Sequence, residues 1–297
     1  MGNNFFSIKN TPLWLQFIYF ILISAGCFIL FTALAGIVVI ISGKNALTPS
    51  IILISQSITV IGTFILPALW FCYARQERMT SFFKLSAHLN SNRLYLKWLW
   101  WLLLWVVSIP LLSYIIRWNA DISLPASFSA VENWMRTMEQ AAQNITNILL
   151  SQKTFAGITL NLIVIALLPA ISEELFFRGV ILRLLSEWFK KKHIAIWVSA
   201  IIFSALHFQF FGFVPRVLLG AILGYAFIYS GSLIVPILLH FVNNVSAVLF
   251  YSSSNPILNS EVETPVPVLW TAVSAFATIA VIIAIIKSDK HNSSNSL

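Results

Sequence analysis

The sequence predicts an all-α fold: a polytopic membrane protein folded as a bundle of about eight transmembrane helices. The 297 residues are 59% hydrophobic and only 9% charged, whereas soluble domains carry about 25% charged residues. The apolar residues gather in runs that approach or exceed the roughly 20 residues needed to cross a bilayer. The net charge of +8 comes from cations that cluster between these runs, which indicates membrane topology and not nucleic-acid binding. Since the composition shows no break, we expect one integral membrane domain over residues 1–297.

Each apolar run is expected to form one span. The runs cover approximately residues 13–41, 51–74, 94–116, 156–182, 194–211, 214–230, 232–251 and 266–286. The first run exceeds the roughly 7–15-residue core of a cleaved signal peptide, so it is expected to remain as a span. Residues 230–232 leave room only for a tight turn between the sixth and seventh spans. Cys27 and Cys72 both fall inside apolar runs and imply no disulfide.

The distribution of Lys and Arg orients this bundle. If the N-terminus is cytoplasmic and the spans alternate, 12 of the 18 cations fall in inner segments: Lys9, Arg75, Arg78, Lys84, Arg93, Lys97, Arg183, Lys190, Lys191, Lys192, Lys287 and Lys290. Outer segments hold five, and Arg178 lies within a span. Because cytoplasmic loops are enriched in Lys and Arg, we expect a multi-pass protein of the cell (inner or plasma) membrane with both termini cytoplasmic.

The longest outer stretch, residues 117–153, contains a helical pattern. Apolar side chains recur at helical spacing on one face: Val131, Trp134, Met135, Met138, Ala142 and Ile145. The pattern predicts an amphipathic helix that lies on the outer leaflet or over the bundle. A lid over a substrate entrance is the alternative interpretation.

Four ionisable side chains other than Arg178 fall well inside the expected spans: Glu173, Glu174, His207 and His240. A charged side chain at the bilayer centre costs roughly 2.5–3.5 kcal/mol even on the mildest scale, so such residues mark functional sites. At about 1.5 Å per residue, Glu173 lies about 15 Å along its helix from Arg183, His240 about 13 Å from Gly231 and His207 about 21 Å from His193. All three are therefore expected near the midplane, where they could converge on one site.

Helical spacing assigns different roles to the two glutamates. Adjacent residues point in different directions on a helix, whereas residues four apart share a face. Glu174 and Arg178 can therefore neutralise each other, which leaves Glu173 as the unpaired carboxylate. Pro169 should loosen the helix just before Glu173.

Two further pairs share a helix face by the same spacing. Phe203 and His207 are four apart, as are His240 and Asn244. Taken singly, each has a structural explanation: a histidine that hydrogen-bonds between helices, a phenylalanine in the core, an asparagine that joins two helices. Taken together with matching depths, they indicate a functional site.

The segments that carry these residues resemble the motifs of a known family. "EELFFR", "FSALH" and "HFVNN" are similar to EExxxR, FxxxH and HxxxN/B of the CPBP family of intramembrane endopeptidases. That family includes the type II CAAX prenyl proteases and bacteriocin-processing or immunity proteins. The resemblance covers residues 156–250, which are expected to hold the catalytic core helices. It implies hydrolysis of a peptide bond in a peptide or protein substrate in or at the lipid bilayer.

The resemblance also implies roles for individual residues. Glu173 would be the general base and would draw a proton from a water held between it and His207. His240 and Asn244 would donate hydrogen bonds to the oxyanion of the tetrahedral intermediate. These four are the expected catalytic residues.

Three residues are expected to support them. The pair of Glu174 and Arg178 would hold the fourth helix in place. Phe203 belongs to the second motif and is expected in the core beside the site.

The sequence is compatible both with a metal-free mechanism and with a zinc-dependent one. Glu173, His207 and His240 together make a His₂Glu set, which is a complement found in catalytic zinc sites. No HExxH motif is present, and the ligands would come from three helices. A mechanism without cofactor is therefore favoured, with a zinc-dependent protease as the alternative.

Other kinds of protein compete with a protease. A proton-coupled carrier also places Glu and His at the midplane, but it favours paired broken helices and internal repeats, which the sequence lacks. A non-catalytic peptide-binding immunity factor would use the same pocket. An aspartyl dyad is excluded, because Asp121 and Asp289 are the only aspartates and lie outside the spans. No GxSxG marks a serine nucleophile.

Overall fold

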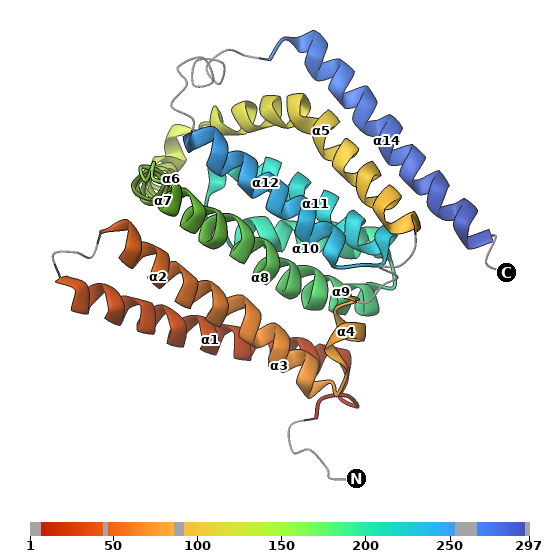
Figure 1. Cartoon of the computed structure of the whole chain (residues 1–297), viewed down its shortest axis with the longest axis horizontal. Helices are drawn as coiled ribbons and strands as arrows, with labels where there is room; N and C mark the ends of the chain where they lie inside the picture. The colour runs from red at the N-terminus through yellow and green to blue at the C-terminus, as the bar shows by residue number, and fades with distance from the viewer. Residues whose placement is uncertain (1–6, 44–46, 86–91, 253–265, 295–297) are drawn as a thin grey trace.

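The described part of the chain is helical. The computed structural model describes residues 7–43, 47–85, 92–252 and 266–294, and these contain no strand (Figure 1). The elements follow one another in this order: α1 (Leu13–Ser42), α2 (Pro49–Val60), η2 (Ile61–Ile65), α3 (Leu66–Ala74), α4 (Met79–Phe82), α5 (Asn92–Ala120), η3 (Ala126–Phe128), α6 (Ser129–Leu150), α7 (Phe155–Asn161), η4 (Leu162–Leu167), α8 (Leu168–Phe176), η5 (Phe177–Ile181), α9 (Leu182–Phe189), α10 (Lys192–Ala205), η6 (Phe210–Gly212), α11 (Phe213–Ser230), α12 (Ile234–Ser252) and α14 (Val268–Ser294).

Six helical stretches of the described chain are long and apolar enough to cross a membrane. They are Leu13–Ser42, Pro49–Ala74, Trp98–Ala120, Phe155–Phe189, Phe210–Ser230 and Val268–Lys287. The chain is therefore an all-α, polytopic integral membrane protein, as its composition predicts.

The other two expected spans are present as shorter apolar helices, Lys192–Ala205 and Ile234–Leu249. The 14 residues of α10 rise only about 21 Å at 1.5 Å per residue, less than the roughly 30 Å of a bilayer core. The predicted span over residues 194–211 is thus too long at its C-terminal end. The chain turns after Ala205, and Phe208 adopts a left-handed conformation with φ of 53°, so His207 lies in a turn and not inside a helix.

Two of the long stretches become π-helical just before a proline. η2 precedes Pro67, and η4 precedes Pro169. A proline has no N–H to donate to the carbonyl of the preceding turn. In the wider π-helical turn, neighbouring backbone N–H groups bond to carbonyls five residues back and so compensate for the missing hydrogen bond. The second case confirms that Pro169 loosens the helix before Glu173. A third π-helical segment, η5, follows directly after α8.

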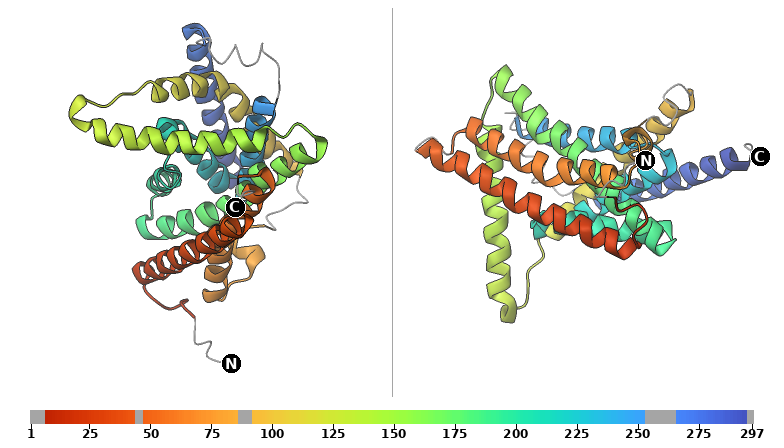
Figure 2. Two further views of the ribbon diagram at one scale, coloured as in Figure 1. Left: turned by 90° about the vertical axis from the view of Figure 1, so that its left-hand side faces the viewer. Right: turned by 90° about the horizontal axis from the view of Figure 1, so that it is seen from below.

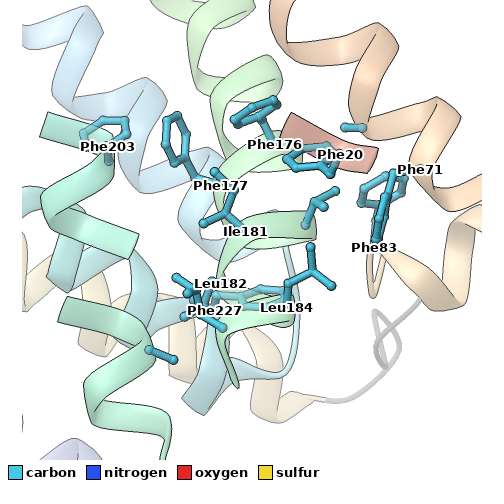
Figure 3. Close-up of a cluster of buried hydrophobic side chains, with 14 of the residues drawn as sticks. Phe20, Phe71, Phe83, Phe176, Phe177, Ile181, Leu182, Leu184, Phe203 and Phe227 are labelled. Atoms are coloured by element: carbon cyan, nitrogen blue, oxygen red, sulfur yellow. The ribbon is translucent and has the colours of Figure 1, made fainter. Parts of the chain in front are cut away.

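A row of aromatic rings connects the N-terminal helices to the middle of the bundle (Figure 3). Phe20 of α1 lies 5.3 Å from Phe71 of α3 and 4.9 Å from Phe176 of α8, measured between ring centroids. Phe177 follows at 5.2 Å from Phe176, and Phe203 of α10 lies 5.0 Å from Phe177. The two phenylalanines within "EELFFR" therefore pack α8 and η5 between α1 and α10.

The amphipathic helix α6 lies across one end of the bundle. Figure 1 shows it along its axis, beside the start of α2, while α1 and α2 are seen from the side. The left view of Figure 2 faces this end, and α6 lies lengthwise across it. Its apolar residues Val131, Trp134 and Met138 are exposed, which fits a helix in the membrane interface. The predicted helix is confirmed.

Glu132 anchors the beginning of α6. Its Oε2 accepts a hydrogen bond from the backbone N–H of Leu124 at 2.9 Å, and its Oε1 accepts one from Nε of Arg136 at 2.9 Å. Both donors favour the ionised carboxylate, and Arg136 contributes most, so the pKa of Glu132 lies below its ordinary value.

Four charges at the opposite end join the loop after α3 to α9. Arg75 pairs with Glu77 at 3.1 Å and with Glu187 at 3.1 Å. Arg183 pairs with the same two glutamates at 2.9 Å and 3.2 Å. Arg183 also lies over the ring of Phe82, 4.3 Å from its centroid. This alternating ring of charges holds the end of the helix that carries the motif glutamates.

The turn between α11 and α12 is as tight as the sequence predicts. Gly231 ends α11 with φ of 70°, a left-handed conformation that costs glycine no steric strain. Ser230 Oγ accepts from the N–H of Ser232 at 3.2 Å and closes the turn. The next helix therefore returns directly beside α11.

Candidate active site

The motif glutamate and arginine form a fully buried pair. Nη1 of Arg178 donates to Oε1 of Glu174 at 2.7 Å, and Nη2 donates to the backbone carbonyl of Gly220 at 2.7 Å. The two side chains are 0% and 1% exposed, so this pair lies in a low-dielectric interior and not at a surface. The pairing predicted from the spacing of four is confirmed.

His240 joins this pair from α12. Its Nδ1 lies 2.9 Å from the same Oε1 of Glu174. Since a carboxylate that is ionised can only accept, Nδ1 must carry the proton. The other ring nitrogen, Nε2, then lies 3.8 Å from Oε2 of Glu173. Glu174 thus orients the His240 ring so that its second nitrogen faces Glu173.

Glu173 is buried and incompletely paired. The residue is 9% exposed, and its Oε2 has no hydrogen-bond partner among the described residues. Unpaired buried carboxylate oxygens are costly, and they persist where function uses them. Glu173 lies on α8, the short helix between the π-helical segments η4 and η5, where π-helical turns often mark functional sites.

The ring of Phe203 lies at the centre of the three motifs. Its centroid is 4.9 Å from that of His207, 6.0 Å from that of His240 and 5.0 Å from Cζ of Arg178. Phe203 therefore packs against both histidine rings and against the motif arginine. It is the predicted core residue, and it also contacts all three motifs.

His207 is held by the end of α10. Its Nδ1 lies 2.8 Å from the carbonyl oxygen of Phe203, and a carbonyl can only accept, so Nδ1 donates and Nε2 is left as an acceptor. The loop beyond it is fixed by Asn119 of α5. The Asn119 amide donates to the carbonyl of Phe210 at 3.1 Å and accepts from the N–H of Val214 at 2.7 Å.

Asn244 lies on α12 one turn after His240. Its Nδ2 donates to the carbonyl of Ala166 at 3.4 Å. Ala166 belongs to η4, three residues before Pro169, in the turn to which that proline cannot donate. The asparagine therefore connects α12 to the helical stretch that carries Glu173.

Some residues at this site were not predicted from the sequence. Asn119 is a polar residue at the end of a span, and Arg216 stands in the first turn of α11, where it donates to Oε1 of Gln209 at 2.8 Å. A cation in the first turn opposes the helix dipole, which is the signal in the sequence that could have singled it out. Asn243 and Trp105, described below, gave no such signal.

The zinc set expected as the alternative is not assembled. No three His, Cys, Asp or Glu side chains are placed to hold a metal ion anywhere in the described segments. Nε2 of His240 lies 3.8 Å from Oε2 of Glu173, while Nδ1 of His207 is bonded to the carbonyl of Phe203.

The fold and this site define an integral membrane protein with a buried cluster of ionisable side chains. Residues 155–246 match the family described as "Rce1-like: Type II CAAX prenyl endopeptidase Rce1-like". The predicted resemblance to these membrane endopeptidases is therefore confirmed over the stretch that carries all three motifs.

A curated relative is similar to part of the chain. The uncharacterized protein YpbD of Bacillus subtilis (strain 168) is 33% identical over 86 residues, which are 28% of this chain and 41% of YpbD. The alignment thus spans less than half of that relative. No solved structure matches the chain.

Proposed function

We propose that the chain is an intramembrane endopeptidase that cleaves a peptide or protein in or at the bilayer without a metal ion. The observation that carries this proposal is the buried Oε2 of Glu173, which has no donor among the described residues and faces Nε2 of His240 at 3.8 Å. The family match to endopeptidases over residues 155–246 supports it.

The charges of the site support Glu173 as the base. If Glu173 and Glu174 carry negative charge, Arg178 and the imidazolium form of His240 would balance them within the buried cluster. Compensated charges are tolerated in a low-dielectric interior, and uncompensated ones are not. In this state Glu173 can accept a proton while Nε2 of His240 can donate one.

The nucleophile is a water molecule between Glu173 and His207. It donates one hydrogen to Oε2 of Glu173 and the other to Nε2 of His207, the ring atom left as an acceptor by the bond to Phe203. Glu173 removes its proton as the water oxygen attacks the peptide carbonyl. Two acceptors aim the lone pair of the water at the substrate.

The resulting oxyanion is stabilised by α12. His240 donates from Nε2 and Asn244 from Nδ2, two groups one helical turn apart on the same face. When the carbon–nitrogen bond breaks, Glu173 returns its proton to the leaving amine. Glu174 keeps His240 protonated on Nδ1 throughout, because it accepts from that atom at 2.9 Å.

We also propose that both termini are cytoplasmic. In Figure 1 the start of α1, the turn between α9 and α10 and the end of α14 lie on the right-hand side, while α6 lies on the left. Lys190 and Lys191 are in that turn, and Lys192 is the first residue of α10. A cation-rich end fits the cytoplasmic face, which assigns α6 to the outer leaflet.

Comparing peptide termini in membranes tests the activity. Membranes with the wild-type protein should contain new peptide ends that are absent with Glu173→Gln, a variant that keeps shape and removes the base. Glu187→Gln, at the ring of charges away from the site, is the matched control and should retain them. Ends that persist with Glu173→Gln, or a purified enzyme inactivated by a chelator and restored by zinc, would overturn the proposal.

A further inference from the structure

Two side chains beside Asn244 form a hydrogen-bonded chain with it. Nε1 of Trp105 on α5 donates to Oδ1 of Asn243 at 3.4 Å. Nδ2 of Asn243 donates to Oδ1 of Asn244 at 3.4 Å, and Nδ2 of Asn244 donates to the carbonyl of Ala166 at 3.4 Å. The chain of bonds thus runs from α5 through α12 to η4.

The direction of these bonds is fixed at both ends. An indole N–H can only donate, and a backbone carbonyl can only accept. Asn243 must therefore turn its oxygen to Trp105 and its amide nitrogen to Asn244. Asn244 in turn presents its oxygen to Asn243 and its NH₂ group toward the helical stretch of Glu173. Neither amide can flip without placing two donors or two acceptors against each other.

We propose that Trp105 and Asn243 are positioning residues, which hold the NH₂ group of Asn244 toward the reacting carbonyl. This rests on the proposed role of Asn244 as an oxyanion donor. Each bond is long, but bonds in a low-dielectric interior strengthen one another along a chain. An amide free to flip would present its oxygen to the oxyanion for part of the time, and two acceptors repel.

The chain itself is tested without any measurement of catalysis. A double-mutant cycle uses the melting temperatures of Trp105→Phe, Asn243→Leu and the double variant in detergent. Removing the second partner after the first should lower the melting temperature less than removing it alone, because the shared bond is already lost. Additive losses would overturn the proposal, whether or not the protein proves to be a protease.

A matched tryptophan controls for the loss of ring area. Trp98 also lies on α5 and packs against the same apolar cluster, but its Nε1 has no partner among the described residues. Trp98→Phe removes the same atoms as Trp105→Phe and should show no coupling to Asn243→Leu. Equal coupling at both positions would mean that packing, and not the hydrogen bond, joins the helices.

Kinetics then test the positioning role on a quenched-fluorescent peptide carrying a cleavage sequence found in the terminus comparison. Trp105→Phe and Asn243→Leu should lower kcat by more than about tenfold, but less than the ~10²–10³-fold expected for loss of a donor. KM should change little, because the oxyanion exists only after attack. A change confined to KM, or an unchanged kcat, would overturn the positioning role.

Asn243→Asp supplies a readout that packing alone does not move. An ionised aspartate cannot donate to Asn244, whereas a protonated one can. The ratio of Asn243→Asp to wild-type kcat should therefore rise as pH falls. A ratio that stays constant with pH would show that the NH₂ group of residue 243 does not orient Asn244.

Discussion

Oε1 of Glu174 lies 2.9 Å from Nδ1 of His240, and the same oxygen accepts from Arg178 at 2.7 Å. One buried atom therefore links the first motif to the third. The pairing of Glu174 with Arg178 follows from helical spacing, but the bond to His240 gives this glutamate a second task. It holds the helices together and fixes which nitrogen of His240 faces Glu173.

Glu174→Gln should consequently lower both stability and turnover. The amide leaves Arg178 without its counter-charge, and breaking a buried pair from one side costs about 3–5 kcal/mol. Thermal unfolding in detergent should show a large loss for Glu174→Gln and a small one for Glu173→Gln. Equal losses in the two variants would mean that the two glutamates have been given the wrong roles.

Asn244→Ala should lower kcat by ~10²–10³-fold, the usual effect of removing one oxyanion donor, with little change in KM. His240→Ala should behave alike, and the double variant should lose less than the product of the two, because both serve one oxygen. These rates are measured with the peptide described above. A fully active Asn244→Ala, together with a His240→Ala enzyme rescued by zinc, would show that the metal-free mechanism is wrong.

Alanine substitutions at two glycines of α11 distinguish an effect on helix packing from an effect on the rate of catalysis. A Cβ at Gly220 would lie 3.1 Å from Cβ of Ala200 and 3.2 Å from Cδ1 of Phe203, and one at Gly224 would lie 3.0 Å from Cγ2 of Ile196. Both alanine variants should destabilise α10 against α11 to a similar extent, by about 1–3 kcal/mol for overpacking. Only Gly220→Ala crowds the Phe203 ring that packs against both histidines, so only it should lower kcat in the fraction that remains folded. Similar rates for both variants would contradict this role for Phe203.

Reporter fusions test the orientation of the bundle. Reporters placed after Gly43, Lys84, Lys153 and Lys191 should read outside, inside, outside and inside. This order follows from the cation-rich end being cytoplasmic. Any exchange between these positions would contradict the proposed topology, and α6 would then lie on the other leaflet.

The anchor of α6 should weaken in acid. Because the folded protein lowers the pKa of Glu132, the carboxylate contributes stability above the ordinary glutamate pKa, and this contribution is lost as pH falls through the lower, folded value. Hydrogen exchange at the Leu124 amide should accelerate in acid relative to the intrinsic rate. Glu132→Gln, which has no carboxylate to titrate, should abolish this extra dependence.

The helices and the partners within one helix could be predicted from the sequence, because apolar length and a period of 3.6 residues determine them. Contacts between helices could not. The bond of Glu174 to His240 depends on how α8 packs against α12, and the bond of Trp105 to Asn243 depends on the approach of α5. Periodicity contains no information on either distance.

The position of His207 shows a second reason why sequence-based prediction of this site is incomplete. Residues 206–211 are apolar enough to extend a span, so composition continues the helix through them. The helix ends at Ala205 because of the backbone turn at Phe208 and the bonds from Asn119. These are tertiary effects on a segment whose own preference gives no sign of a break.

The π-helical turn η4 adds one residue to the span that carries Glu173. In such a turn each N–H reaches back to the fifth carbonyl instead of the fourth, so Leu162–Leu167 contains one residue more than the same turn of α-helix would. Deleting a single residue there would let the turn relax to α-helical form while Glu173 and Glu174 kept their orientation. The same deletion beyond Leu168 would rotate both carboxylates away from His240. Tolerance to one-residue deletions should therefore change abruptly at the boundary between η4 and α8, a pattern that deletion scanning would reveal as a step and not as a gradient.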